Sequence, residues 1–248
     1  MTLLEGIFLI ASGIFAGFLN TVAGGGSLIT LPLLIFLGLP SAEANASNRV
    51  AIFAQNIFSV AGFRSKGVSM FPFAWYVAFP ALLGAIIGSK IAVDIDETLF
   101  NRILAVIMLM VMGITIFKPK VSSIEEGPMT PKKLWISVIA FFFIGIYGGF
   151  IQAGIGFIMI ATLTAIHGFK MAKTNSIKVF VALVYTSAAL VVFYLSGKIR
   201  WEYGLVLALG QSAGGWLASR WSVGVSDRLI RMILLVTVMA LSVKLWFF

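Results

Sequence analysis

Two clusters of glycine interrupt two long apolar runs, and their residue types suit the binding of a negatively charged solute. The clusters are Ala23-Gly24-Gly25-Gly26-Ser27 and Gln152-Ala153-Gly154-Ile155-Gly156. A helix that breaks inside a membrane exposes backbone groups, which is tolerated only where they line a cavity or bind something. The helix start after each break offers unbonded N–H groups and the positive end of a dipole, which together bind anions. We expect these helix starts at Ser27 and Phe157.

Close helix packing is the alternative role for these glycines, since small residues let two helix backbones approach. We favour the binding site, because broken helices at matching places in two halves of a chain are typical of secondary transporters. The predicted substrate-binding residues at the breaks are Gly24, Gly25, Gly26, Ser27, Gln152, Gly154 and Gly156.

A polar stretch follows each cluster and supplies side-chain donors. Helical spacing places Asn45, Asn48, either Gln55 or Asn56, and Ser59 on one stripe, and Asn175, Lys178 and either Tyr185 or Thr186 on another. Polar groups this deep in a membrane should point into the bundle. We therefore add Asn45, Asn48, Arg49, Asn175 and Lys178 to the predicted substrate-binding residues. The alternative is that the asparagines cap helices and the cations extend to lipid headgroups.

Several classes of chemistry are excluded by what the chain lacks. It has no cysteine, one histidine (His167) and nine acidic residues, all of which fall in predicted loops or at segment ends. A cation carrier or a carboxylate proton relay would place an acid inside a span. An enzyme would need a nucleophile–base pair or a metal cluster. We therefore expect no catalytic residues, no metal site, no cofactor and no enzymatic activity.

The elements that position these residues must cross a membrane. Of 248 residues, 60% are hydrophobic and only 11% are charged, which excludes a soluble domain of this size. The runs 6–42 and 134–169 would form helices of about 55 Å if unbroken, too long for a hydrocarbon core of about 30 Å. Each run therefore divides at its glycines into two short segments that return to the side where they began.

The distribution of lysine and arginine supports this division. With returning runs, twelve basic residues fall on one side and six on the other; with single crossings the split is nine and nine. Because cytoplasmic loops carry an excess of Lys and Arg, the first scheme is favoured. It predicts ten segments, both termini outside and the central loop inside. The excess of basic residues thus reflects membrane orientation and predicts no nucleic-acid partner.

The chain also repeats itself at an offset of 130 residues, which pairs Gly24 with Gly154 and Asn45 with Asn175. Five segments per repeat would invert the second half relative to the first. The predicted fold is therefore an all-α polytopic membrane protein with two inverted repeats of about five segments each, 8–10 helices in total. We place the first repeat at 1–117, a cytoplasmic linker at 118–132 and the second repeat at 133–248. We assign the small residues of the fourth segments, Pro80, Gly84, Gly88, Gly210, Gly214 and Ala218, to helix packing.

These motifs resemble a known family over nearly the whole chain. Gly24-Gly25-Gly26-Ser27 followed by Ala42-x-x-Asn45-x-x-x-Arg49, and Gly154-Ile155-Gly156 followed by Ala172-x-Thr174-Asn175-x-x-Lys178, resemble the two halves of the TauE/SafE sulfite and organosulfonate exporters. The resemblance extends to permeases of the 4-toluene sulfonate uptake type. It implies a multi-pass permease of the bacterial inner membrane that moves sulfur-containing anions, usually with about eight spans. Arg49 and Lys178 would then be charge partners of the anion.

The sequence thus predicts a secondary transporter, in the export direction, for small anions such as sulfite, sulfoacetate or other organosulfonates, working by alternating access. The alternatives are an anion channel and a carrier of non-sulfur organic anions such as carboxylates. The expected partners are the small anionic substrate and the lipid bilayer. Coupling to protons or another ion and assembly into a homodimer are left open.

Overall fold

A computed structural model gives the fold for residues 1–68, 70–117 and 127–224, with the side chains of 108, 109 and 111–117 left aside. The described residues form helices and no strands. The helices are α1 (Leu3–Val22), α2 (Ser27–Phe36), α3 (Ser41–Ser65), α4 (Phe73–Asp94), α5 (Glu97–Phe117), α6 (Pro131–Phe150), α7 (Ile155–His167), α8 (Met171–Leu195) and α9 (Trp201–Ser222). The predicted tenth segment, at 232–243, lies outside the described residues.

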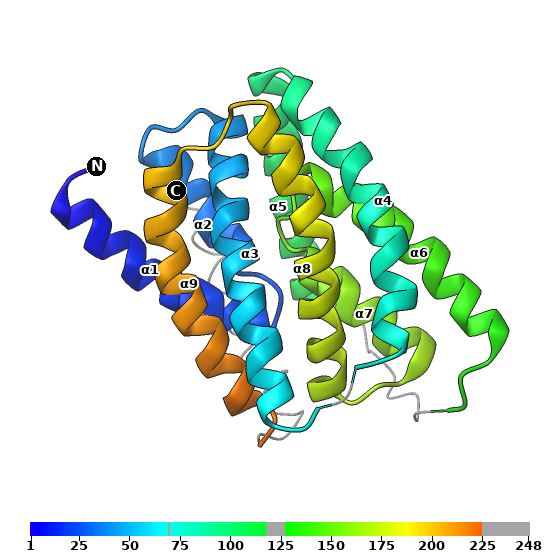
Figure 1. Ribbon diagram of the computed structural model, residues 1–248. Helices are drawn as coiled ribbons and strands as arrows, with labels where there is room; N and C mark the ends of the chain where they lie inside the picture. The colour runs from blue at the N-terminus through cyan, green and yellow to red at the C-terminus, as the bar shows by residue number, and fades with distance from the viewer. Residues whose placement is uncertain (69, 118–126, 225–248) are drawn as a thin grey trace.

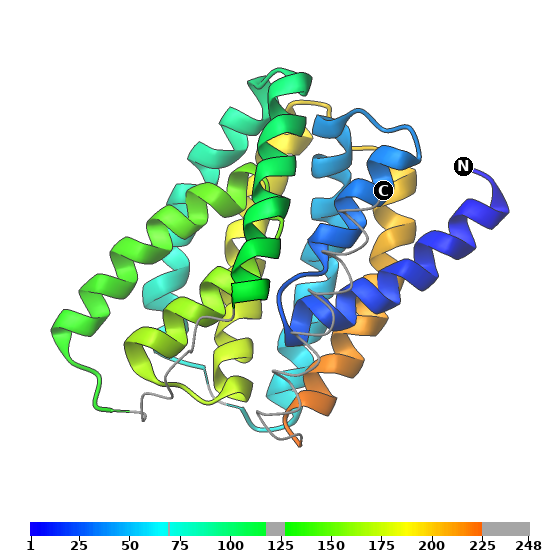
Figure 2. The same cartoon turned by 180° about the vertical axis from the view of Figure 1, so that it is seen from behind.

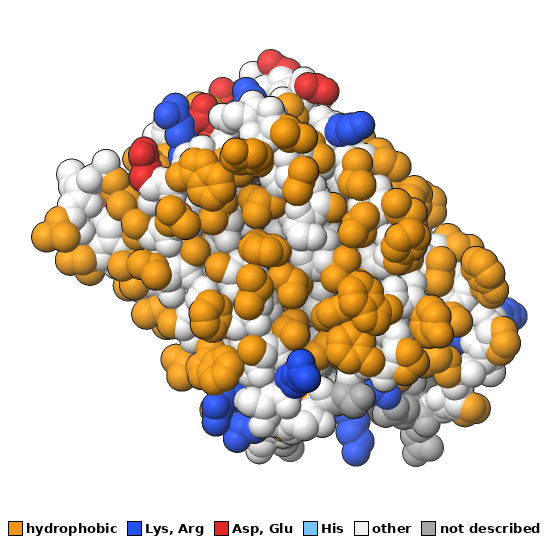
Figure 3. Space-filling view, in the orientation of Figure 1, with side chains coloured by type: hydrophobic (Ala, Val, Ile, Leu, Met, Phe, Trp, Pro, Cys, Tyr) orange, Lys and Arg blue, Asp and Glu red, His pale blue; other side chains and the backbone are white. Residues whose placement is uncertain are grey.

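Four of these helices, α1, α4, α6 and α8, are long and apolar enough to cross a membrane, while α2 and α7 are shorter apolar helices. The lateral surface is apolar as well: Figure 3 shows hydrophobic side chains covering the middle of the molecule, and charged ones gathered toward its two ends. An apolar belt between charged ends is the surface that a bilayer requires. The chain is a polytopic membrane protein, as predicted.

The two long apolar runs fold as helical hairpins that enter the bundle from opposite ends. In Figure 1, α1 runs inward from the upper part of the molecule and α2 returns upward, whereas α6 and α7 enter from below and return downward. Figure 2 shows the same arrangement from behind. Between the hairpins, α3 and α8 pack against each other and run in opposite directions. Each run therefore returns to the end where it began, as the charge distribution predicted.

Glycines allow two pairs of helices to cross at very short distance. A Cβ added at Gly84 would lie 2.1 Å from the carbonyl oxygen of Phe142, so α4 and α6 are in backbone contact there. A Cβ at Gly214 would lie 2.0 Å from the carbonyl oxygen of Ile14, so α9 and α1 are in backbone contact there. The first helix of each predicted repeat thus packs on the fourth helix of the other. This confirms the packing role assigned to the small residues of α4 and α9.

The register at the breaks differs from the predicted constant offset of 130. The turn bond from the amide of Gly24 to the carbonyl of Leu19 matches the bond from Gln152 to Tyr147, an offset of 128. The offset returns to 130 where α3 begins at Ser41 and α8 at Met171. The change arises because α7 is longer than α2, with 13 residues against 10. The structural counterpart of Gly24 is therefore Gln152, not Gly154.

Candidate functional site

Each break is a short turn with left-handed backbone. After α1 ends at Val22, Gly24 adopts φ +91° and α2 begins at Ser27, as predicted. After α6 ends at Phe150, Gln152 adopts φ +65° and Gly154 φ +72°. The next helix begins at Ile155, two residues before the predicted start at Phe157. The start is earlier because the second break spans 151–154, which corresponds to 23–26 at an offset of 128 rather than 130.

The two breaks touch each other in the interior of the bundle. A Cβ built on Gly24 would lie 2.3 Å from the Cα of Gly156, and one built on Gly156 would lie 2.2 Å from the Cα of Gly24. Real Cβ atoms do not approach other atoms this closely, so both positions require glycine for contact alone. The sequence separates these glycines by more than half of the chain, and the fold brings their backbones into contact.

A polar pair from α8 holds the end of α1. The ammonium of Lys178 donates to the carbonyl oxygens of Asn20 (2.9 Å) and Thr21 (2.8 Å) and to Oδ1 of Asn175 (2.9 Å). The amide of Asn175 donates to the carbonyl of Val22 at 3.0 Å. These are the last carbonyls of α1, where the backbone has no helical partner and the dipole is negative.

An equivalent pair from α3 holds the end of α6. The guanidinium of Arg49 donates to the carbonyls of Gly148 and, at 2.9 Å, Gly149, and the amide of Asn45 donates to the carbonyl of Phe150 at 2.7 Å. Arg49 also donates to Oδ1 of Asn45 at 3.3 Å. We call these two groups, Asn45 with Arg49 and Asn175 with Lys178, the helix-end clasps.

The clasps revise the expectation for the two cations. Arg49 is 0% and Lys178 2% exposed, so neither extends to lipid headgroups. Each uses its terminal nitrogens on backbone carbonyls rather than holding them ready for an anion. All three ammonium hydrogens of Lys178 have an oxygen partner. Their charges nevertheless stay in a region of low dielectric, where they act on any nearby anion.

A small cavity lies beside the touching breaks. Its polar side is formed by residues of α1, α3, the second break and α8, and its apolar side by α7 and α8. The lining residues are Asn20, Asn56, Gln152, Ile155, Gly156, Met159, Lys178, Val179, Ala182 and Tyr185. Its volume is about 10 Å³, roughly the space for one water molecule. The structure therefore shows a narrow cavity that must widen to admit a solute.

Two polar groups of this lining have no hydrogen-bond partner in the described part of the chain. They are Oε1 of Gln152 and the hydroxyl of Tyr185, and both residues are buried, at 2% and 0% exposure. Buried polar atoms without partners cost free energy and are therefore rare. Two of them beside one cavity leave bonding capacity that a water molecule or a ligand can take up.

The predicted site residues thus divide into three groups. Gln152, Gly156 and Lys178 line the cavity, while Asn45, Arg49 and Asn175 hold helix ends. The remaining predicted residues shape or support the breaks: Gly24, Gly25, Gly26, Ser27, Asn48 and Gly154. Asn48 accepts a hydrogen bond from Thr30 of α2 at 2.8 Å. The predicted free amides are partly used, since Leu28, Ile155 and Phe157 donate to carbonyls within the breaks.

The structure also resolves the two alternatives on the polar stripes. Asn56 lines the cavity, whereas Gln55 donates to Thr21 and accepts from Asn20 of α1. On α8, Tyr185 rather than Thr186 lines the cavity. Asn20 was not among the predicted residues. The signal for it was present, because it is a polar residue in an apolar run just before the first glycine cluster.

Among the residues that the structure describes, no acidic side chain lines the cavity, and the acids lie at helix ends or in loops, as predicted. Glu43 forms an ion pair of 2.6 Å with Arg200 at the upper end of the bundle, where the exposed guanidinium has its pKa raised by that carboxylate. The cavity therefore combines a buried cation with neutral donors and no competing carboxylate, a composition suited to an anion.

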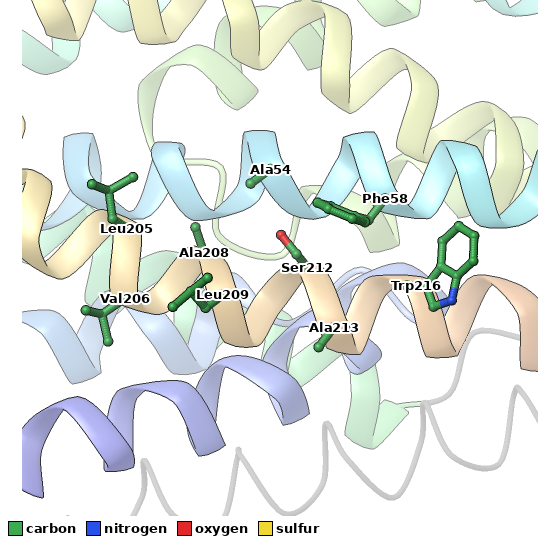
Figure 4. A pocket seen from close by; sticks show the side chains of 9 residues that line it. All are labelled: Ala54, Phe58, Leu205, Val206, Ala208, Leu209, Ser212, Ala213 and Trp216. Carbon is green, nitrogen blue, oxygen red and sulfur yellow. The ribbon is translucent and has the colours of Figure 1, made fainter.

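A larger concavity lies elsewhere, in the groove between α3 and α9. It has a volume of about 670 Å³ and is lined by Ala54, Phe58, Leu205, Val206, Ala208, Leu209, Ser212, Ala213 and Trp216. Figure 4 shows these mostly apolar side chains, with Ala54 and Phe58 on α3 and the others on α9. Its described lining contains no charged residue and no residue of the clasps, so we do not assign the solute to it.

Comparisons with known proteins agree with a membrane transporter. The family profile described as "Sulfite exporter TauE/SafE" matches residues 9–245. A "Probable membrane transporter protein" from Haemophilus influenzae is 26% identical over 94% of this chain and 91% of its own length. The "Probable membrane transporter protein YfcA" from Escherichia coli K12 is 27% identical over 98% of this chain and 89% of its own length. No solved structure matches. On its sequence profile and its helical membrane fold, the chain belongs to the TauE/SafE sulfite exporter family.

Proposed function

We propose that this protein is a secondary transporter that exports small sulfur-containing anions, such as sulfite, sulfoacetate or other organosulfonates, across the bacterial inner membrane. The observation that carries the proposal is the contact between the two breaks beside a cavity that includes Lys178 and, among the described residues, no acid. Broken helices that meet inside the bundle are the usual site of substrate binding in secondary transporters.

The anion would occupy the widened cavity between the breaks. Lys178 supplies the positive field from α8, and Gly156, where α7 begins, forms part of the wall of the cavity. The clasps keep the ends of α1 and α6 in place, so that the breaks present the same groups in each cycle. Alternating access then requires each hairpin to move together with the helix that clasps it, α1 and α2 with α8, and α6 and α7 with α3. An inside-negative membrane potential would favour outward movement of the anion.

Flux into proteoliposomes tests the proposal. Labelled sulfite or sulfoacetate should accumulate with saturable kinetics and show counterflow, whereas a channel would conduct without saturation. Asn45→Ala combined with Asn175→Ala should reduce transport, because both helix ends lose an amide donor. Unchanged transport in the double variant would count against this site. Counterflow with carboxylates but not with sulfur anions would favour the alternative carrier.

Binding can be screened independently of transport. A ligand that binds only the folded protein raises its apparent stability by mass action. A thermal-shift series with sulfite, thiosulfate, sulfonates and carboxylates on purified protein should therefore rank the anions. The proposal predicts that the sulfur oxyanions give the largest shifts, and larger shifts with carboxylates would contradict it.

A further inference from the structure

The backbone of Gln152 is the one place in the described chain where a residue other than glycine adopts positive φ. A conformation of this kind costs a non-glycine residue about 1–3 kcal/mol and persists where the surroundings impose it, often at functional sites. At the counterpart in the first break the residue is Gly24, which has the same backbone sign and no side chain. Glycine would therefore fit position 152 with less strain, and the glutamine side chain must have another use.

The side chain of Gln152 lies in the cavity lining with its Oε1 unpartnered. That oxygen is an acceptor, so a half-turn of the amide, which puts the Nε2 donor in its place, is what an anion would require. Tyr185 lies in the same lining, two helical turns beyond Lys178 on α8, and its hydroxyl is also unpartnered. The absence of a side chain at Gly148 leaves space for this ring, because a Cβ at Gly148 would lie 3.0 Å from Cε2 of Tyr185. Two neutral hydrogen-bonding groups thus face one space, and the terminal nitrogens of the neighbouring cations are already bonded to backbone.

We propose that Gln152 and Tyr185 are the specificity-determining pair of the anion site, and that they contact the oxygen atoms of the solute directly. The inference rests on the proposed function and refines it. In this arrangement the cations attract the anion and hold the helix ends, while the neutral pair recognises its shape. A tetrahedral sulfonate offers three oxygen acceptors to such donors, whereas a planar carboxylate offers two.

Methanesulfonate and acetate provide a matched pair of probes, because both carry one methyl group and one negative charge. The wild-type protein should bind methanesulfonate more tightly in thermal-shift titrations. Because a hydrogen bond to a charged group is involved, Tyr185→Phe and Gln152→Gly should each weaken methanesulfonate binding about tenfold or more, with a smaller effect on acetate. The ratio of the two dissociation constants should therefore fall in both variants.

Stability without a ligand separates this role from a structural one. Gln152→Gly removes the strained side chain and Tyr185→Phe removes an unpartnered buried hydroxyl, so neither variant should melt below the wild type. Ser176→Ala is the matched control, because Ser176 is a buried residue of α8 whose hydroxyl is also unpartnered but does not line the cavity. It should leave the binding ratio unchanged.

The outcomes are distinguishable. If the ratio of the two dissociation constants stays at the wild-type value in both variants, the proposed role of Gln152 and Tyr185 is overturned, while the anion site itself is not. A lower melting temperature with equal loss of both anions assigns the two residues a structural role and also overturns it. If neither anion shifts the wild-type protein, and sulfite does not either, the proposed function itself fails and the pair with it.

Discussion

The contact between the breaks predicts a large difference in stability between two alanine variants at glycines that have nearly the same φ angle. Gly24 has φ +91° and Gly38 has φ +90°, so alanine at either position is strained by about the same amount, roughly 1–2 kcal/mol. A Cβ at Gly38 meets nothing within 4 Å, whereas one at Gly24 would lie 2.3 Å from Gly156 Cα and 2.9 Å from the amide of Phe157. These are backbone atoms, which cannot rotate away.

Gly24→Ala should therefore lose a further 1–3 kcal/mol, approximately, from overpacking. For a chain of this length, 1 kcal/mol corresponds to about 2–4 °C in melting temperature. We expect Gly24→Ala to melt several degrees below Gly38→Ala in the same detergent, and to lose transport while Gly38→Ala keeps it. Thermal unfolding followed by tryptophan fluorescence provides the comparison. Equal melting temperatures for the two variants would refute the contact between the breaks.

Further predictions concern the clasps and the helix crossings. Lys178→Met should destabilise the protein by about 1–3 kcal/mol and abolish transport, because the carbonyls of Asn20 and Thr21 lose their partner, and thermal unfolding with proteoliposome flux measures both. Glu43→Gln should leave melting and flux close to wild type, since its ion pair with Arg200 is exposed to solvent; a large loss would show that this pair is part of the transport machinery. Gly214→Leu should prevent α9 from packing on α1 and reduce the yield of folded protein in detergent, which size-exclusion chromatography would detect; wild-type yield would contradict the crossing.

Much of the fold follows from local signals. Glycine clusters in runs too long for one crossing predicted the two hairpins, and the start of α2 at Ser27 was correct. Small residues at every fourth position predicted the crossings through Gly84 and Gly214. These features depend on chain length and on the size of single residues, and the sequence displays both directly.

The organisation of the site depended on contacts that the sequence does not display. The bonds of Arg49 to Gly148 and of Lys178 to Thr21 join residues 99 and 157 positions apart, so a cation beside a break could equally have been a ligand or a clasp. The two-residue difference between the hairpins has no local marker, because added apolar residues simply lengthen α7. It therefore concealed the correspondence between Gly24 and Gln152. The inversion of the two halves, the domain limits, the orientation of the termini and a homodimer remain predictions.

The most direct measurement uses the absence of cysteine from this chain, which makes single-cysteine variants simple to prepare. Ala182→Cys would place a thiol in the cavity lining, and Ser212→Cys would place one in the groove between α3 and α9 as a control. The central claim, that an anion occupies the cavity beside the touching breaks, predicts that methanesulfonate slows labelling of Ala182→Cys by N-ethylmaleimide and leaves Ser212→Cys unaffected. An unchanged rate at position 182, at methanesulfonate concentrations that saturate transport, would contradict it.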